Sequence, residues 1–197
     1  MLTFDSVMSS ILVLRGERGG WLPRARGDYA GAMKDLHEYR IDIEWSGNRG
    51  TGTSGYREYG RELLIHAEHK PPLEGSADPT FHGNRDRWNP EELLVAALAQ
   101  CHMLSYLHMA VRAGVVVTAY TDAASGTMQQ RGIGGAFTEV VLRPRVTVTD
   151  ASMVDAAREA HAAAREACFI ANSVNFPVHH EPEIVVAGSE SAAPEPM

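Results

Sequence analysis

The chain has 197 residues, of which 44% are hydrophobic, and its formal net charge at pH 7 is -7. This length suits one domain with a substantial core, with or without short tails. The negative charge argues against a general nucleic-acid binder, and no 18 consecutive residues are apolar, which argues against a membrane-spanning helix. Two cysteines are too few for a disulfide framework, so we expect a cytoplasmic protein with two thiols.

The two ends of the chain differ from its middle in composition. Residues 1–32 are rich in arginine and glycine with little periodicity, which predicts a poorly ordered leader. An apolar run at 7–14 has no Lys or Arg before it, so it is not typical of a signal peptide. Residues 189–197 are rich in Ser, Ala, Pro and Glu, which predicts a flexible tail. We therefore assign the folded domain to residues 33–188.

The first part of this domain has the pattern of strands and a loop. Residues 37–45 alternate, which predicts a strand with one apolar face, formed by Tyr39, Ile41, Ile43 and Trp45. A glycine-rich turn at 47–53 contains Arg49. Two more strand-like stretches and a long polar loop with prolines follow, at 56–59, 62–68 and 70–88.

A long helix is predicted from Asn89 to about Arg112. Asn89 is a favourable N-cap, Pro90 suits the first turn, and the two glutamates that follow favour the positive end of the helix dipole. Gly114 is expected to end the helix. The predicted apolar face consists of Leu94, Ala97, Leu98, Cys101, Leu104 and His108, with Tyr106 nearby.

The rest of the domain predicts strands and a second helix. Residues 115–121 and 137–148 are rich in strand-forming residues and are joined by a turn that contains Gly132, Gly134 and Gly135. Ser125-Gly126 is also interpreted as a turn. A helix is expected to begin after Asp150, and a last strand covers 183–187. The helix has an inner face at helical spacing: Val154, Ala157, His161, Ala164 and Cys168. This order of strands and helices predicts an α+β fold.

Each of the two cysteines lies on the apolar face of a predicted helix. A free cysteine often only packs in a core, so an inert role is one interpretation. If the two faces pack together, the sulfurs of Cys101 and Cys168 come within bridging range, as a redox pair requires. In such a pair one thiolate attacks and the second thiol resolves the sulfenic acid, and a cation activates the attacking thiol. The candidate cations are Arg49, Arg85 and Arg87.

Glu91 precedes Cys101 by ten positions, which corresponds to about 15 Å along a helix axis. Glu91 is therefore too far away to touch Cys101 of its own helix. If the two residues serve one site, Glu91 must come from an antiparallel neighbour. A twofold dimer with crossed central helices would supply that neighbour.

Histidines near the cysteines raise metal binding as an alternative. Cys-x-x-Cys and His-Glu-x-x-His spacings are both missing from the sequence, so we predict no metal and no cofactor. His108 and His161 are interpreted as core histidines, and His179-His180 as a solvated pair. The glycines at 47–52 lack the Lys-Ser/Thr and the following helix of a phosphate-binding loop.

Taken together, these residues resemble the OsmC/Ohr family of hydroperoxide-reducing proteins over roughly 37–187. The resemblance rests on Asn89-Pro90-Glu91-Glu92-Leu93-Leu94, on Cys101 ten positions after Glu91, and on Cys168 a further 67 positions along. Phe169 stands where well-known members have proline, which is typical of a divergent subgroup. The resemblance implies an intertwined homodimer whose two central helices are flanked by antiparallel sheets.

The same resemblance implies a thiol-dependent peroxidase for organic hydroperoxides. Cys101 is then the peroxidatic thiol and Cys168 the resolving thiol, while Arg49 activates Cys101 and Glu91 holds Arg49. A lipoyl-type dithiol is the implied reductant, and neither a nucleic acid nor a membrane is an expected partner. Two non-enzymatic alternatives on the same fold stay open: an oxidant sensor and a protein that binds a small apolar ligand.

Overall fold

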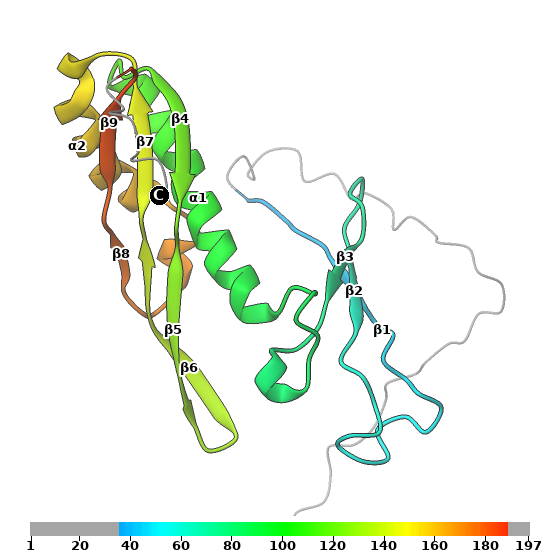
Figure 1. Ribbon diagram of the computed structural model, residues 1–197. Coiled ribbons are helices and arrows are strands. Elements are labelled where there is room, and N and C mark those ends of the chain that lie inside the picture. The colour runs from blue at the N-terminus through cyan, green and yellow to red at the C-terminus, as the bar shows by residue number, and fades with distance from the viewer. Residues whose placement is uncertain (1–35, 189–197) are drawn as a thin grey trace, which may run out of the picture. The chain divides into compact units, whose positions relative to one another are not determined.

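The computed structural model describes residues 36–188, so the leader predicted at 1–32 and the tail predicted at 189–197 lie outside the described residues. The helices and strands of the described range belong to one compact unit that begins at Arg40 (Figure 1). In chain order they are β1 (Asp42–Trp45), β2 (Leu63–His66), β3 (Leu73–Gly75), α1 (Pro90–Arg112), β4 (Val117–Asp122), β5 (Ser125–Arg131), β6 (Gly134–Leu142), β7 (Pro144–Val148), α2 (Val154–Ala167), β8 (Val178–His180) and β9 (Glu183–Val186). This mixture confirms the predicted α+β class.

Strands β1, β2 and β3 form an antiparallel sheet in that order, with Ile43 opposite Ile65. The first strand is shorter than predicted, and its side chains are exposed, Ile43 by 62%. The strand expected at 56–59 is wrong, because this segment forms turns. Arg61 explains the difference: its guanidinium donates to the carbonyls of Tyr56 and Tyr59 and lies over both rings.

The segment from β4 to β7 is a long antiparallel hairpin, in which β5 pairs with β6 and β4 pairs with β7. Gly132 allows the tight turn, since its φ of +63° is in the left-handed region that favours glycine. The turn predicted at Ser125-Gly126 is wrong, because both residues lie in β5 opposite Val141 and Val140. A Cβ at Gly126 would lie 2.7 Å from the Phe137 ring, so this glycine makes room for packing.

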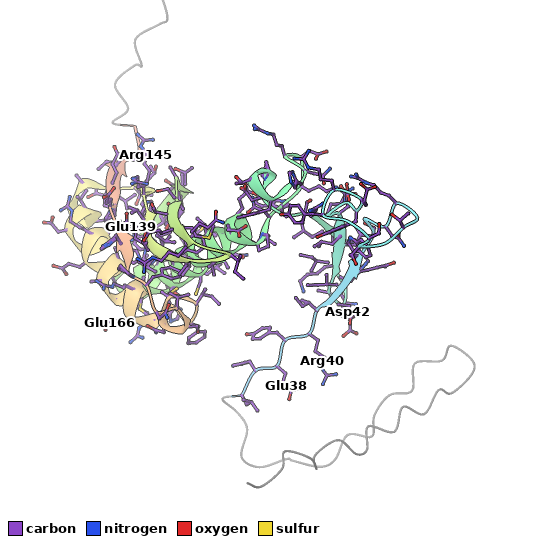
Figure 2. All side chains as sticks on the ribbon, turned by 90° about the horizontal axis from the view of Figure 1, so that it is seen from below. Glu38, Arg40, Asp42, Glu139, Arg145 and Glu166 are labelled. Carbon is purple, nitrogen blue, oxygen red and sulfur yellow. The ribbon has the colours of Figure 1, made fainter. Side chains whose placement is uncertain are left out.

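Strands β8 and β9 pair in parallel with β6 and β7 and complete two three-stranded sheets. The sequence predicted β9 but not the short strand β8. Helices α1 and α2 lie on one side of the strands from β4 to β9 (Figure 1). Figure 2 shows the charged side chain of Glu166 on α2 directed away from these strands.

Helix α1 begins and ends as its local sequence predicts. Asn89 and Glu92 form a reciprocal capping box, with Oδ1 of Asn89 2.7 Å from the Glu92 amide, and Gly114 follows the last turn with a φ of +71°. By length and composition alone α1 could cross a membrane, and only 22% of its most apolar window is buried inside the chain. The helix therefore presents much of its apolar surface outside the fold of a single chain.

The buried face of α1 differs from the predicted one. The structure buries Leu98, His102, Tyr106 and Ala110, whereas Leu104 is 57% exposed and His108 is also exposed. Apolar side chains surround this helix on every face, so their spacing does not select the face that packs. For α2 the predicted inner face is confirmed, because Ala157, His161, Ala164 and Cys168 are all buried.

Two apolar clusters hold the helices against the strands. One joins the second half of α1 to α2 and β7 and includes Tyr106, Val146, Val148 and Ala157. The other joins the first half of α1 to β6 and β8 and consists of Leu98, Val140, Leu142 and Val178. The residues of α1 between these clusters, from Ala99 to Ser105, include Cys101.

Candidate functional site

The fold brings the two thiols together. Cys101 lies in the middle of α1 and is partly exposed, whereas Cys168 is the C-cap residue of α2 and only 1% exposed. Both are free thiols, and burial and then the nearby Cys101 side chain raise the pKa of Cys168. The two cysteines are therefore neighbours where α1 packs against the end of α2.

The surroundings of Cys168 keep it protonated. Its backbone is extended where α2 ends, and its sulfur accepts a hydrogen bond from the amide of Ala171 at 3.5 Å. Burial, and then the nearby Cys101 side chain, raise the pKa of Cys168 to about 11. Cys168 is therefore a neutral donor at pH 7, and its S–H can stabilise a thiolate on Cys101. This asymmetry favours Cys101 as the attacking thiol.

Glu91 and Arg49 are not in contact with this thiol pair. Glu91 lies in the first turn of α1, and its Oε2 atom is buried with no hydrogen-bond partner among residues 36–188. Arg49 is exposed in the turn after β1, and its side chain has no partner in the described part of the chain. Of the other candidate cations, Arg87 lies 3.7 Å from a carboxylate oxygen of Glu74.

A cavity of about 590 Å³ adjoins Glu91 and has both apolar and acidic walls. Trp88, Val95 and Phe137 supply apolar surface, and Asp78, Glu92 and Asp122 supply carboxylates in addition to Glu91. Oδ2 of Asp122 is also buried without a hydrogen-bond partner in the described chain, and burial raises the pKa of this group. The unpartnered buried oxygens of Glu91 and Asp122 make this cavity suitable for a guanidinium group from outside the chain.

A second polar group lies between the same two helices, and we call it the histidine cluster: His102 of α1, His161 of α2 and His180 of β8. Nε2 of His102 and Nδ1 of His161 are 3.0 Å apart, and the ring centroids of His102 and His180 are 4.1 Å apart. His180 was predicted to be solvated, and this is wrong because its Nε2 is buried. His108, predicted to be in the core, is exposed instead.

No sequence pattern pointed to the histidine cluster, because its members are far apart in the chain and His102 lies off the predicted face of α1. Within residues 36–188, no group of three or more His, Cys, Asp or Glu side chains has a geometry that could hold a metal ion. The cluster therefore consists of imidazoles that contact one another directly.

The family model for OsmC-like proteins matches residues 82–183, which is more than half of the chain. The chain belongs to the OsmC family. The matched region runs from the loop before α1 to the start of β9 and contains both cysteines. The family membership predicted from the Asn89-Pro90-Glu91 motif and the cysteine spacing is thus confirmed.

Solved structures of this OsmC-like chain's relatives share its fold. An OsmC-like protein of unknown function from Vibrio cholerae is 30% identical, with a TM-score of 0.67 over 75% of this chain and 99% of that one. An organic hydroperoxide resistance protein from Elizabethkingia anophelis is 16% identical, with a TM-score of 0.58 over 78% of this chain and 99% of that one. An organic hydroperoxide resistance protein from Legionella pneumophila is 18% identical, with a TM-score of 0.56 over 78% of this chain and 100% of that one. Comparison with curated proteins gave no match.

Proposed function

We propose that this OsmC-like protein is a thiol-dependent peroxidase that reduces organic hydroperoxides. The observation that carries the proposal is a pair of neighbouring free thiols, of which Cys101 is partly exposed and Cys168 is buried with a raised pKa. Two structures with the same fold belong to organic hydroperoxide resistance proteins, which supports the reaction class. The apolar residues around α1 favour an organic peroxide over hydrogen peroxide.

The proposed reaction has two chemical steps in the protein. The Cys101 thiolate attacks one oxygen of the peroxide, the O–O bond breaks, and the alcohol leaves after taking up a proton, so that Cys101 becomes a sulfenic acid. Cys168 then attacks this sulfur, water leaves, and a disulfide forms. The proton of Cys168 is available to the departing hydroxide. An external dithiol, of the lipoyl type by family resemblance, restores both thiols by disulfide exchange.

Activation of Cys101 is assigned to Arg49 and Glu91 of a second copy of the chain. A guanidinium near Cys101 would stabilise its thiolate and hold the leaving oxygen of the peroxide. The unpaired buried oxygen of Glu91 is a suitable acceptor for the same guanidinium and would fix its position. The single chain leaves Arg49 exposed and Glu91 without a cation, so the proposal requires a dimer to complete the site.

Three surfaces of the chain support a twofold dimer, in which OsmC family members are typically found. On α1, Cys101, Leu104, His108 and Val111 are spaced three, four and three apart and so share one face. Leu104 is 57% and Val111 75% exposed on this face. Strand β1 also exposes its apolar side chains, and the cavity beside Glu91 has apolar walls. A crossed pair of α1 helices would cover this face and place Cys101 at the interface.

The test is consumption of cumene hydroperoxide with excess dihydrolipoamide as the reductant. Wild-type protein should turn over many times, and Cys101→Ser should show only the background rate. Cys168→Ser should accumulate a sulfenic acid on Cys101, which dimedone traps as an adduct detected by intact mass. The proposal is wrong if Cys101→Ser consumes the peroxide as fast as wild type. A single oxidation without turnover would instead identify an oxidant sensor.

A further inference from the structure

We infer that the histidine cluster positions the resolving thiol: His102, His161 and His180 hold α2 and β8 against α1 as neutral imidazoles, and the cluster opens as the pH falls, which releases Cys168 from Cys101. The inference rests on the proposed function only where it calls Cys168 the resolving thiol. The contact between the helices and its response to acid depend on the histidine cluster and not on peroxidase activity.

The chain places this contact on the same two helices that carry the thiols. His102 directly follows Cys101 on α1, and His161 lies seven residues, or two helical turns, before Cys168 on the buried face of α2. The 3.0 Å contact between Nε2 of His102 and Nδ1 of His161 is therefore a direct polar link between the helices that carry the cysteines. Tyr106 stacks on His161 with 4.0 Å between ring centroids, and His180 adds β8 to the same group.

The contact needs one unprotonated ring nitrogen, and the burial of both rings disfavours a charge on either of them. In a bond between two ring nitrogens, one nitrogen donates a proton and the other must be unprotonated to accept it. His102 is 0% and His161 4% exposed, so a charge on either ring would be placed in a dry interface. Burial and the neighbouring histidines lower the pKa of His102 to about 3 and that of His161 to about 4.

The groups around the cluster also oppose its protonation. Arg165 of α2 and His179 of β8 lower the pKa of His180, after burial as the main cause. The nearby carboxylates are engaged elsewhere: Glu139 of β6 lies 3.8 Å from His179, and Glu181 forms an ion pair with Arg143 at 2.9 Å. A cavity of about 440 Å³, lined by His161, His180 and Arg165, gives water a route to the cluster when it opens.

The sign of the pH dependence follows from the lowered pKa values. In the closed state the histidines stay neutral, whereas in an open, hydrated state they titrate near 6.5 and bind protons. The open state therefore gains in population as the pH falls below 6.5. For a histidine with a closed-state pKa of about 4, the equilibrium between closed and open states shifts by roughly 30-fold between pH 7.5 and pH 5.

The reactivity of Cys168 measures this opening without any peroxide. In a Cys101→Ser background the buried Cys168 reacts with 4,4′-dithiodipyridine only when the structure opens. The rate in the urea-unfolded protein, divided by the rate in the folded protein at the same pH, gives a protection factor. We expect this factor to fall at least 30-fold from pH 7.5 to pH 5. A factor that stays constant over this range would overturn the inference.

Substitutions at His161 separate the positioning role from simple packing. Asn places a polar atom where Nδ1 of His161 lies but does not titrate. His161→Asn should therefore keep the protection factor of its parent at pH 7.5, and its fall in protection between pH 7.5 and pH 5 should be about 30-fold smaller than that of the parent. His161→Leu fills the space without a polar contact and should lower the protection at pH 7.5. His69→Asn is the control, since His69 is exposed and its positive φ suits Asn.

The outcomes are distinct from those of the peroxidase assay. If His161→Asn and the parent protein have superimposable pH profiles, the cluster is ordinary core and the inference fails, whatever the peroxide assay gives. If the profiles differ as expected but cumene hydroperoxide is not consumed, the proposed function fails and the inference stands. Should His161→Leu not fold, the comparison with His161→Asn still decides. A profile that changes after treatment with EDTA would assign the cluster to metal binding and overturn the inference.

Discussion

Two regions of this protein differ in whether a single chain supplies all the partners of their side chains. Between α1 and α2, Cys101 meets Cys168, and His102 meets His161, all within one chain. At the β1–β3 sheet and the first turn of α1, by contrast, apolar side chains are exposed and a buried oxygen of Glu91 lacks a partner. The difference teaches that the proposed disulfide would need only one chain, whereas the proposed activation of the attacking thiol needs two.

The largest expected effect concerns the activating pair. Arg49→Ala should lower kcat/KM for cumene hydroperoxide by roughly 10²–10³-fold, the usual cost of removing one group that stabilises developing charge. Glu91→Gln should lower it less, and the double variant should be no slower than Arg49→Ala, because both residues act through one guanidinium.

Glu92→Gln is the matched control for Glu91→Gln, since Gln at this position preserves the capping box at the start of α1. Its peroxidase rate should equal that of wild type. Additive losses in the Arg49 and Glu91 double variant would show that the two residues act independently. The activating role would then move to Arg85 or Arg87.

Mixing two inactive variants tests whether the site is shared between chains. Cys101→Ser supplies an intact Arg49, and Arg49→Ala supplies an intact Cys101. If Arg49 acts across the dimer, co-refolding the two chains at equal amounts should restore activity in about a quarter of the sites, since half of the dimers are mixed and each has one complete site. No restoration would place the activating residue in the same chain as the thiol.

The exposed face of α1 offers an intermediate effect. Val111→Lys places a charge on the face proposed to meet a second α1. It should therefore raise the dimer dissociation constant, measured by sedimentation equilibrium, at least tenfold, which corresponds to about 1.4 kcal/mol of binding free energy. Ile133→Lys is the control, because Ile133 is fully exposed at the tip of the β5–β6 hairpin. Equal dimerisation of the two variants would contradict the proposed interface.

The smallest expected effect is local. Asn89→Ala removes the side-chain acceptor of the α1 capping box and should lower the free energy of unfolding by about 1 kcal/mol in urea denaturation. Asn89→Asp keeps an acceptor and should retain most of the stability. A loss several times larger for Asn89→Ala would mean that the cap also supports the region around Glu91.

The sequence predicted the features that depend on neighbouring residues. Asn89 and Gly114 set the ends of α1 through local geometry, so both ends were predicted correctly. The buried face of α2 was also predicted, because polar residues occupy its other faces. For α1 the apolar residues lie on every face, and only contacts with distant strands select Leu98 and Tyr106 for burial.

For the candidate site, the sequence predicted that the two cysteines lie near each other but not the histidine cluster between the same helices. Cys101 and Cys168 each occupy a helix at helical spacing from apolar neighbours, so packing of the helices implied their contact. His102 and His161 are 59 positions apart and come from two helices whose register no local pattern reveals. Gly126 was misread for the same reason, since its role depends on the distant ring of Phe137.

The contact between the two thiols also has a consequence for the lifetime of the protein. A disulfide between Cys101 and Cys168 would close a loop of about 67 residues, from the middle of α1 to the end of α2. Loop closure of this size reduces the entropy of the unfolded chain by an amount worth about 4 kcal/mol at 25 °C. The oxidised protein should therefore melt at a higher temperature and resist proteolysis better than the reduced protein. Exposure to an oxidant would in this way prolong the survival of the molecules that have met it.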